Sequence, residues 1–507
     1  MKLSLEPETR QLLEIVRSCT PSELPVHLVG GAVRDLALGR PVQDFDFVLP
    51  EQSLVLAKQV RRRLHGVGFT LDDERQTARV ILNQGQPQEL VLDFVIYTGG
   101  SLLADVRSRD FTLNTLLIDL DQPEEVLDFL GGWEDLQARR LRAASAQSMQ
   151  LDPLRVLRGI RFAQGFQLEV EPETQRLMQQ AAAGLNRVSG ERIRDELFKI
   201  LAQGQAVGAF RMMDMVGALL PVFPELTALR QLPALPPHVH PLWEHTLQVM
   251  AYLDQLLRPQ LKAAPSKMNA YLQAAWQALA PYQDKLEAHM NKPLQASRPR
   301  ASLLKLAALY HDAGKPLVQT QDAHGRFHFY GHDQAGSQLM ETRARALMLG
   351  KEEIVYLTAV VNAHMRLHAY SKPGIELTNR AIYRYFRGLG EAGLDNALLS
   401  LADTLAAFEE TLPMDAWQRE VNAARQLMAA WFEEDNAVVR PTKLLDGKEV
   451  QQLFQISPGP LVGAALDALH EAQAAGEVAD REEAIAFVTA FLDAQKQKGY
   501  THENTDE

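Results

Sequence analysis

The sequence predicts a small mixed α/β unit at the N-terminus, followed by helices over the rest of the chain. Up to about residue 150, runs of branched and aromatic residues alternate with amphipathic segments, a pattern that indicates strands and helices in one sheet-based unit. From Leu151 onward, apolar residues recur at spacings of three and four, and we expect no strand there. A chain of 507 residues is too long to fold around a single hydrophobic core, so several domains are expected.

The elements of the first unit follow from local signals. An amphipathic segment at Pro7–Cys19 predicts an opening helix, and two glycines end a short apolar strand at His27–Val29. Branched and aromatic residues favour strands in the later runs. The further expected elements are a helix over Ala32–Leu38, strands over Asp44–Leu49, Thr77–Asn83 and Glu89–Tyr97, a helix beginning near Arg109, and a strand near Leu116–Leu120.

Breaks in the helical pattern divide the remainder of the chain. Prolines cluster between Pro221 and Pro241, and a second break falls at Ala437–Thr442. The polar stretch from Leu257 to Arg300 has the pattern of an amphipathic helical insertion inside the third region. We therefore expect domains at residues 1–150, 151–225, 226–436 and 437–507.

Composition narrows the class of protein. With Cys19 as its one cysteine, the chain can form no intrachain disulfide and no cysteine-based zinc site. The first residues are acidic where a signal peptide needs an apolar run. No apolar stretch is long enough to span a membrane. We expect a cytoplasmic protein with no membrane partner.

Charge gives a mixed indication about nucleic acid. The formal net charge of −12 is unfavourable for phosphate binding, which needs a basic surface. Because arginines crowd one stretch, the sequence still allows a local basic groove on an acidic protein. These residues are Arg139, Arg140, Arg142, Arg155, Arg158 and Arg161.

Two acidic residues alternate with two aromatic residues in the run that begins at Asp44. On a strand, Asp44 and Asp46 project from one face while Phe45 and Phe47 point to the core. Mg²⁺ relieves the repulsion between two such carboxylates and keeps coordination sites for substrate phosphates. Two ions could activate a 3′-hydroxyl and stabilise departing pyrophosphate. The pair predicts a catalytic site, although an isolated Asp-X-Asp is more often a solvated strand edge.

A glycine pair and an arginine make the acidic pair more specific. Gly30 and Gly31 would let the backbone approach a triphosphate at the N-terminus of the following helix, where free N–H groups favour anions. Arg34, one turn into that helix, can add a charged clamp. Asp93 lies in an otherwise apolar strand, where an unpaired carboxylate costs several kcal/mol. Asp93 is therefore either a third acidic group of the site or the structural partner of an arginine.

The run from Gly30 to Phe47 resembles the signature of the class II nucleotidyltransferases, the bacterial family of CCA-adding enzymes and poly(A) polymerases. The similarity covers about residues 25–225. The family's next motif recognises ribose, which implies that Arg109, Asp110 and Asn114 select ribonucleotides; a serine replaces the motif's first arginine. The resemblance implies a nucleotidyltransferase head, an all-α neck at residues 151–225, ATP and CTP as substrates, Mg²⁺ as the metal and tRNA as the partner.

A further motif of the family reads the incoming base with an aspartate and an arginine. Asp152 and Arg155 match it, and Arg158 and Arg161 follow. On one helix face, their spacing of three would let an acceptor and a forked donor meet the edge of one base. Leu151 stands where the family has a glutamate, so base discrimination could be looser or restricted.

The family's last motif resembles the segment that contains Glu191 and Arg192. We interpret both residues as structural, bracing the neck helices. In the tail, Gly459 and Pro460 predict a helix start at Leu461. The tail resembles the C-terminal segment of many family members, which implies a tRNA contact; a packing module alone fits equally well.

Histidines and aspartates recur in order through the third region. Neutral imidazole and carboxylate suit transition metals, and the helices of one bundle can bring them together. Each histidine taken alone is more often a hydrogen-bonded core residue. The ordered set resembles the HD superfamily of metal-dependent phosphohydrolases and implies an HD-type helical body. The implied primary metal ligands are His245, His311, Asp312 and Asp403, and the ligands for a second metal are His332 and His364.

Several functions fit these features. The leading hypothesis is a tRNA nucleotidyltransferase that adds C, A or both to the 3′ end. The alternatives are a poly(A) polymerase of the same family, an HD phosphohydrolase with a degenerate head, and a non-catalytic RNA-binding protein. Intact Asp44 and Asp46 count against a degenerate head, and the adjacent His311 and Asp312 count against a scaffold.

Overall fold

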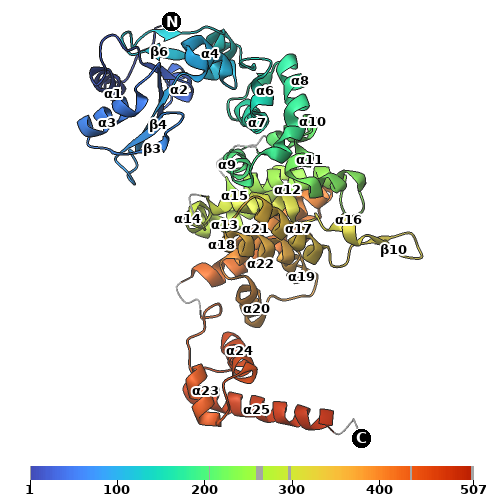
Figure 1. Ribbon diagram of the computed structural model, residues 1–507. Coiled ribbons are helices and arrows are strands. Elements are labelled where there is room, and N and C mark those ends of the chain that lie inside the picture. Colours follow the sequence, from blue (N-terminus) through green and yellow to red (C-terminus); the bar gives the residue numbers. More distant parts are fainter. Residues whose placement is uncertain (1, 205, 259–266, 295–297, 434–436, 504–507) are drawn as a thin grey trace. The chain divides into compact units, whose positions relative to one another are not determined.

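The computed structural model describes residues 2–204, 206–258, 267–294, 298–433 and 437–503 (Figure 1). The chain divides into two compact units. The first comprises Met1–Ile200 with Gly208–Val222, and the second comprises Leu201–Val207 with Phe223–Glu507. A mixed sheet in the first unit precedes helices in the second, which confirms the predicted fold class. Within the described residues, no helix combines the length and apolar character that a membrane span requires.

A mixed sheet forms the head of the first unit. Its strand order is β3-β4-β5-β2-β1-β6-β7, and β2 and β5 are parallel whereas the other neighbours are antiparallel. This arrangement places the acidic strand β2 in the middle of the sheet. The strands are β1 (His27–Val29), β2 (Asp44–Leu49), β3 (Val67–Asp72), β4 (Thr77–Leu82), β5 (Leu90–Ile96), β6 (Leu117–Asp119) and β7 (Val126–Leu127).

Helices cover the core face of this sheet. Helix α1 has Pro at its first turn and buries Leu12, Leu13 and Val16, the face that packs toward α3. Helix α3 in turn contacts β4 and β5. The head helices are α1 (Pro7–Ser18), α2 (Gly31–Ala37), α3 (Ser53–Arg63), α4 (Leu102–Ser108) and α5 (Gly132–Gln137).

The rest of the first unit is helical apart from one short strand pair. Helix α7 buries Val156, Leu157 and Ile160 and carries its arginines on the other side. The elements are α6 (Ser148–Leu151), α7 (Arg155–Gly165), α8 (Pro172–Ala181), α9 (Gly190–Leu201), α10 (Ala206–Met215) and α11 (Leu219–Val222), with β8 (Arg140–Leu141) paired to β9 (Glu169–Val170).

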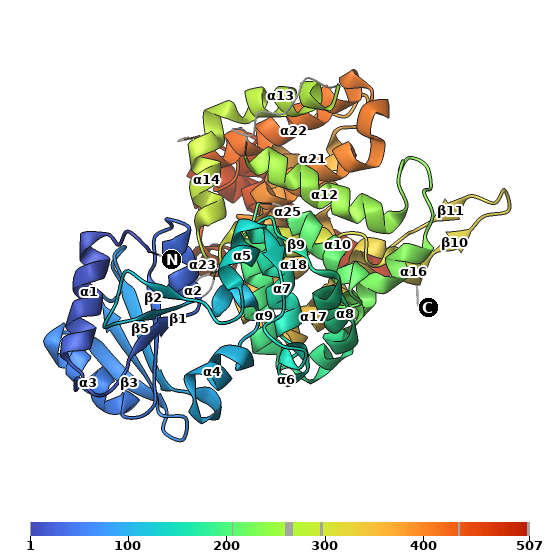
Figure 2. The same cartoon turned by 90° about the horizontal axis from the view of Figure 1, so that it is seen from above.

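The second unit is a helical bundle with a smaller helical module at its end. Helices α12, α21, α22 and α13 lie side by side in the bundle (Figure 2). The bundle contains α12 (Leu242–Leu257), α13 (Lys267–Leu279), α14 (Gln283–Asn291), α15 (Arg300–Tyr310), α16 (Lys315–Val318), β10 (Thr320–Gln321), β11 (Phe327–His328), α17 (His332–Ala346), α18 (Lys351–Ala363), α19 (Arg366–Tyr370), α20 (Asn379–Leu389), α21 (Ala392–Phe408) and α22 (Met414–Phe432).

The terminal module has its own hydrophobic core, which includes Leu445, Val450 and Leu469. Its helices are α23 (Gly447–Phe454), α24 (Pro460–Ala474) and α25 (Arg481–Glu503). Helix α24 begins at Pro460, one residue before the predicted start, with Gly459 as its N-cap.

Several expectations for individual elements were wrong. The helix expected to begin near Arg109 instead ends there, because α4 stops at Ser108 and Arg109 has extended backbone angles. Strand β3 and helix α3 were not expected. Strands also occur after Leu151, in β9 and in the β10–β11 hairpin. These strands are two residues long, too short to produce a periodic pattern.

Candidate functional site

The two acids of β2 lie on one face of the strand, as predicted. Phe45 and Phe47 are 2% and 0% exposed and pack in the core, while Asp44 is exposed and Asp46 is half-buried. The alternation follows from the pleat of the strand. Both carboxylates therefore face the same side of the sheet, where they line a cavity.

Asp93 is the partner of Asp46 across the parallel pair of β2 and β5. The Arg79 guanidinium donates to both oxygens of Asp93 at 2.8 Å, so one of the two alternatives for this residue, an arginine partner, is present. Burial raises the pKa of Asp46; Arg109 opposes that rise, while Asp93 and Asp44 add to it. The strand pair thus concentrates negative charge that a cation would stabilise.

Gly30 is required at the turn between β1 and α2. Its φ of +75° lies in the left-handed region, and a Cβ there would lie 3.1 Å from Arg109 Nη1 and 3.5 Å from Asp46 Oδ2. The glycine therefore lets Arg109 and Asp46 approach the backbone at the start of α2. Arg109 is also held by Asp105, at 2.9 Å.

A chain of buried hydrogen bonds connects α2 to α7. Arg34, 7% exposed, donates to Asn114 Oδ1 at 2.6 Å and to the neighbouring Asp35. Asn114 donates to Asp110 Oδ1 at 2.9 Å, and Arg158 donates twice to Asp110 Oδ2 at 2.7 and 2.8 Å. The Arg34 guanidinium is thus bound to Asn114 and Asp35, and it positions Asn114 within this network.

Asp110 has little acceptor capacity left for a ribose hydroxyl. Its Oδ1 accepts from Asn114 and from the Phe111 N–H, and its Oδ2 accepts two N–H groups of Arg158, which fills about four acceptor positions. Burial opposes ionisation, but Arg158 and Asn114 hold the pKa of Asp110 below its ordinary value. A ribose contact at Asp110 would have to displace one of these donors.

Replacing Arg158 by alanine is expected to loosen this network. Asp110 is 5% exposed, and loss of its main donor should lower the free energy of local opening by about 1–3 kcal/mol. Hydrogen exchange of peptides from α7 measures this opening. Arg176→Ala, which removes an exposed ion pair with Glu173, is the matched control and should leave exchange in α7 unchanged. Equal protection in both variants would contradict the assignment.

The expectation that Asp152 and Arg155 share one helix face was wrong. Asp152 lies between α6 and α7 with extended backbone angles, and its Oδ1 accepts from the Leu154 N–H ahead of α7. Its Oδ2 accepts from Arg192 at 2.7 Å. Proline at position 153 stops any continuous helix through this segment. Arg192, interpreted from the sequence as a structural brace, therefore reaches the predicted base-reading aspartate.

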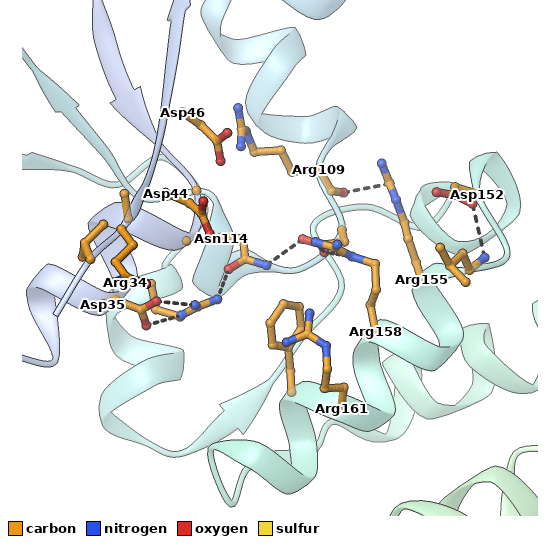
Figure 3. A pocket seen from close by; sticks show the side chains of 18 of the residues that line it. Arg34, Asp35, Asp44, Asp46, Arg109, Asn114, Asp152, Arg155, Arg158 and Arg161 are labelled. Atoms are coloured by element: carbon orange, nitrogen blue, oxygen red, sulfur yellow. Dashed lines mark hydrogen bonds and ion pairs between the residues drawn. The ribbon is translucent and has the colours of Figure 1, made fainter. Parts of the chain in front are cut away.

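These residues surround one cavity of about 740 Å³ in the first unit (Figure 3). Phe162 lies on its floor, with the guanidinium of Arg161 4.3 Å from the ring centre. The structure brings together all the predicted residues of this site except Asp93, which lies one strand away behind Asp46. Those lining the cavity are Gly30, Gly31, Arg34, Asp44, Asp46, Arg109, Asp110, Asn114, Asp152, Arg155, Arg158 and Arg161, together with Arg192.

The predicted histidine ligands converge in the second unit. His245 of α12 and His311 at the end of α15 approach each other at 3.3 Å between their Nε2 atoms, and both are 0% exposed. Asp403 Oδ1 lies 3.1 Å from His245 Nε2, and Asp312 Oδ2 lies 3.3 Å from His311 Nε2. This group of nitrogen and oxygen donors matches what a transition metal takes in a protein.

A second group shares Asp312 with the first. Asp312 Oδ1 lies 3.4 Å from His332 Nε2 and 3.7 Å from His364 Nε2. The Nδ1 atoms of His311, His332 and His364 lie 2.7–2.8 Å from backbone carbonyl oxygens, to which they donate. These bonds fix the tautomer that turns the Nε2 lone pair toward the centre. Asp312 therefore lies where it can bridge two cations.

Four further residues of this centre were not predicted. His238 meets His245 edge to face, with their Nδ1 atoms 3.3 Å apart, and the Lys315 ammonium lies 2.6 Å from Asp312 Oδ2. His368 lies between Asp403 Oδ2 and Glu420, and although burial opposes it, these carboxylates raise its pKa to about 10. The sequence signal available was the lysine of the His311–Lys315 run; the other three residues have no local signal.

The centre opens onto a cavity of about 1240 Å³ in the second unit. Asp312, His332 and Asp403 line it, together with the aromatic side chains of Phe327 on β11 and Tyr330 just before α17. A phosphate group alone would fill a small part of this volume. The centre is therefore accessible to a substrate larger than inorganic phosphate.

A glycine turn and paired aspartates on a mixed sheet, beside a wall of arginines, define a nucleotidyltransferase of the poly(A) polymerase class. The family model described as the poly A polymerase head domain matches residues 26–142. The model described as the probable RNA and SrmB-binding site of polymerase A matches residues 167–229, and the HD domain model matches residues 242–407.

Whole-chain relatives specify the family. The A-adding tRNA nucleotidyltransferase of Deinococcus radiodurans is 32% identical over 473 residues, which cover 92% of this chain and 95% of that protein. The CC-adding tRNA nucleotidyltransferase of Thermus thermophilus is 31% identical, over 91% of this chain and 92% of that protein. The chain belongs to the tRNA nucleotidyltransferase family.

Solved structures share the fold along most of the chain. A CCA-adding enzyme in an apo form is similar with a TM-score of 0.61 and 19% identity, over 96% of this chain and 95% of that one. The Thermotoga maritima CCA-adding enzyme complexed with tRNA is similar with a TM-score of 0.57 and 21% identity, over 96% of both chains. The order of head, helical segment and bundle is thus common to these proteins.

Proposed function

We propose that this chain adds C, A or both to the 3′ end of tRNA in the cytoplasm, with CTP and ATP as nucleotide donors. The observation that carries the proposal is the single cavity that holds Asp44 and Asp46 together with the arginine wall and Asp152. The two acids for nucleotidyl transfer, Asp44 and Asp46, and the acceptor for a base edge, Asp152, line the same cavity. Relatives that carry out A addition and CC addition to tRNA support this activity.

The residues around the cavity have separate roles in positioning the nucleotide. The turn at Gly30 lets a triphosphate approach the backbone beside Arg109, whose guanidinium lies next to Asp46. Arg34 holds Asn114, Asn114 holds Asp110, and Asp110 holds Arg158, so the wall of the cavity is fixed before a nucleotide arrives. A prefixed wall positions the α-phosphate for attack by the tRNA hydroxyl without a further ordering cost.

Asp44 and Asp46 are the residues that would hold Mg²⁺. They fit because burial, with the neighbouring acids Asp93 and Asp44 adding to it, raises the pKa of Asp46, a cost that a hard cation offsets. When bound, Mg²⁺ supplies charge stabilisation to the phosphoryl groups. Asp93 acts in this arrangement through its charge on Asp46, and Arg79 holds its carboxylate by two hydrogen bonds.

In this proposal the neck region binds the tRNA. The neck region carries the match to an RNA-binding model over residues 167–229, which supports binding of tRNA beside the head. A local basic wall on an acidic chain agrees with this assignment, since phosphate contacts need only a local positive surface. A poly(A) polymerase would use the same cavity, so the RNA that the protein extends distinguishes a tRNA nucleotidyltransferase from a poly(A) polymerase.

The test is addition of labelled CTP and ATP, with Mg²⁺, to tRNAs that end before the CCA, after C and after CC. Completion of CCA on all three would establish the full activity, and C or A alone would establish one half of it. EDTA is expected to abolish addition in each case. Long A tracts on any RNA would favour the poly(A) polymerase, and no addition on any substrate would contradict the proposal.

We further propose that the cluster of histidines and aspartates in the second unit, here called the HD centre, binds a divalent transition metal and hydrolyses phosphoesters. The bridging position of Asp312 between two histidine groups favours this second activity. A metal bound there would supply Lewis acidity toward a phosphoester. His245, His311, Asp312 and Asp403 would hold one ion, and Asp312, His332 and His364 would hold another.

A further inference from the structure

A row of side chains crosses the head sheet in register and ends at the acidic pair. Phe69 of β3 lies opposite Arg79 of β4, which lies opposite Asp93 of β5. Asp93 in turn lies opposite Asp46 of β2. Because residues directly opposite each other in a sheet project from the same face, these four side chains share the face that carries the acids.

Phe69 is the outermost member of this row, on the edge strand of the sheet. It is 48% exposed, and Val67, which projects from the same face of β3, is 51% exposed. The opposite face is the buried one, where Ala78 and Val80 of β4 belong to the core beneath α3. An exposed aromatic ring on a sheet face is a platform on which a nucleobase can stack.

Arg79 lies between this ring and the acids. Its Nε and Nη2 donate to Asp93 at 2.8 Å, and within the described residues its Nη1 makes no hydrogen bond. The Arg79 side chain is 38% exposed, so Nη1 can donate to a ligand while the bonds to Asp93 persist. A phosphate is the ligand that suits such a cationic donor.

The chemistry of nucleotide addition gives this side of the sheet a role. In an in-line displacement, the attacking hydroxyl and the leaving pyrophosphate lie on opposite sides of the phosphorus. The cavity extends from the acids toward Gly30, at the end of β1, where the triphosphate is proposed to lie. The 3′-hydroxyl of the RNA would then approach the acids from the β5 side, where the row of Arg79 and Phe69 begins.

The spacing of the strands sets which nucleotide can reach the ring. Neighbouring strands lie ~4.8 Å apart, so the three steps from β2 to β3 place Phe69 roughly 14 Å from Asp46. At ~3.4 Å per stacked nucleotide, this span corresponds to about four nucleotides, and to fewer in an extended strand. An RNA whose 3′-hydroxyl lies at Asp46 would therefore bring one of its preceding bases to Phe69.

We propose that Phe69 stacks on a base of the tRNA acceptor end, a few nucleotides before the 3′ terminus, and that Arg79 Nη1 binds a phosphate between that base and the terminus. This assignment rests on the proposed nucleotide addition and adds a surface that positions the RNA. Stacking tolerates any base, because every base has a π face, so the ring can hold the strand while the 3′ end grows.

The test uses tRNAs that end before the CCA and after CC, with 2-aminopurine at each of the last few positions in turn. Stacking quenches the fluorescence of this base, so the wild type is expected to quench it at a position before the terminal nucleotide. Phe69→Ala should abolish that quenching and raise KM for tRNA by about tenfold, the scale of one lost base stack, with kcat nearly unchanged. Phe69→Trp should retain quenching and KM, whereas Phe69→Leu, apolar without a ring, should behave like Phe69→Ala.

Val55→Ala is the matched control, since Val55 is 50% exposed on α3, the helix on the opposite face of the sheet. It should retain both quenching and KM. Full quenching in Phe69→Ala, or equal recovery by Phe69→Leu and Phe69→Trp, would overturn the proposal. A wild-type dimer that Phe69→Ala converts to a monomer, with quenching unchanged, would assign this face to a second copy of the chain and overturn it as well.

The quenching measurement needs no turnover, so it separates this assignment from the proposed function. If the wild type quenches the probe and Phe69→Ala does not, yet neither protein adds a nucleotide, the proposed function fails and the assignment of Phe69 stands.

Discussion

Replacing Asp46 by alanine is expected to reduce nucleotide addition to tRNA by about 10³-fold or more, because a metal that stabilises the phosphoryl groups contributes several kcal/mol and each 1.36 kcal/mol is tenfold in rate. Asp46 is the half-buried member of the acidic pair and lies beside both Gly30 and Arg109. Asp44, at the exposed end of β2, is expected to be required as well.

The same substitution should not unfold the chain. Burial and the neighbouring acids raise the pKa of Asp46 above its unfolded value, so its charged form destabilises the folded head at any pH above that folded pKa. Removing the charge, in Asp46→Asn, should leave the thermal midpoint unchanged or raise it. Activity and stability therefore move in opposite directions, as expected where a charge is kept for function.

The measurement combines incorporation of labelled nucleotide with a thermal melt of each variant. Asp73→Ala is the matched control, since Asp73 is an exposed acid in the turn between β3 and β4 of the same sheet. It should retain full activity and an unchanged midpoint. Full activity in a well-folded Asp46→Ala protein would remove the acidic pair from the catalytic site.

Local pattern explains which parts of the head could be predicted. Strand β2 has the predicted bounds because four adjacent residues, Asp44 to Phe47, alternate between acids and aromatics and two apolar residues follow them. Strand β3 was missed although Val67, Phe69 and Leu71 alternate along it with Gly68, Thr70 and Asp72. It is an edge strand largely exposed on both faces, so this alternation does not mark a buried face. The prediction of a helix beginning near Arg109 was wrong for a different reason. The N-cap that starts the helix is Ser101, so α4 ends before Arg109.

Tertiary contacts explain the rest of the nucleotide site. Asp110 was predicted as a ribose contact, yet its acceptors are taken by Arg158 and Asn114, and no spacing in the sequence shows that pairing. Arg192 reaches Asp152 across 40 positions in the chain. The residues that the motifs predicted therefore lie around one cavity, while the partner of each residue depended on how α7 and α9 pack.

The histidine centre shows the same division. Its six predicted ligands come from five helices or helix ends, and the motif order was enough to bring them together. By contrast, His368 of α19 contacts Asp403 and is itself held by Glu420 of α22, and such supporting residues follow from packing alone. Sequence order thus gives the ligands of a site more readily than the groups that orient them.

His311→Ala is expected to remove metal binding and phosphohydrolase activity from the HD centre while nucleotide addition stays within about twofold of the wild type. His311 Nε2 lies among the donors of the first group, so its loss should weaken metal affinity by more than the 10–100-fold typical of an orienting residue, about 100-fold or more. Addition should persist because the acidic pair lies in the other compact unit.

Metal content per chain after dialysis against Mn²⁺ or Ni²⁺, and hydrolysis of a simple aryl phosphate, measure the first effect, and the tRNA assay measures the second. His311 is fully buried, so His311→Asn, closer in shape, keeps the test valid if the alanine variant misfolds. His324→Ala, an exposed histidine on the β10–β11 hairpin, is the control and should retain both activities. Loss of tRNA addition in folded His311→Asn would mean that the two centres are coupled, because His311 and the acids of β2 belong to different compact units.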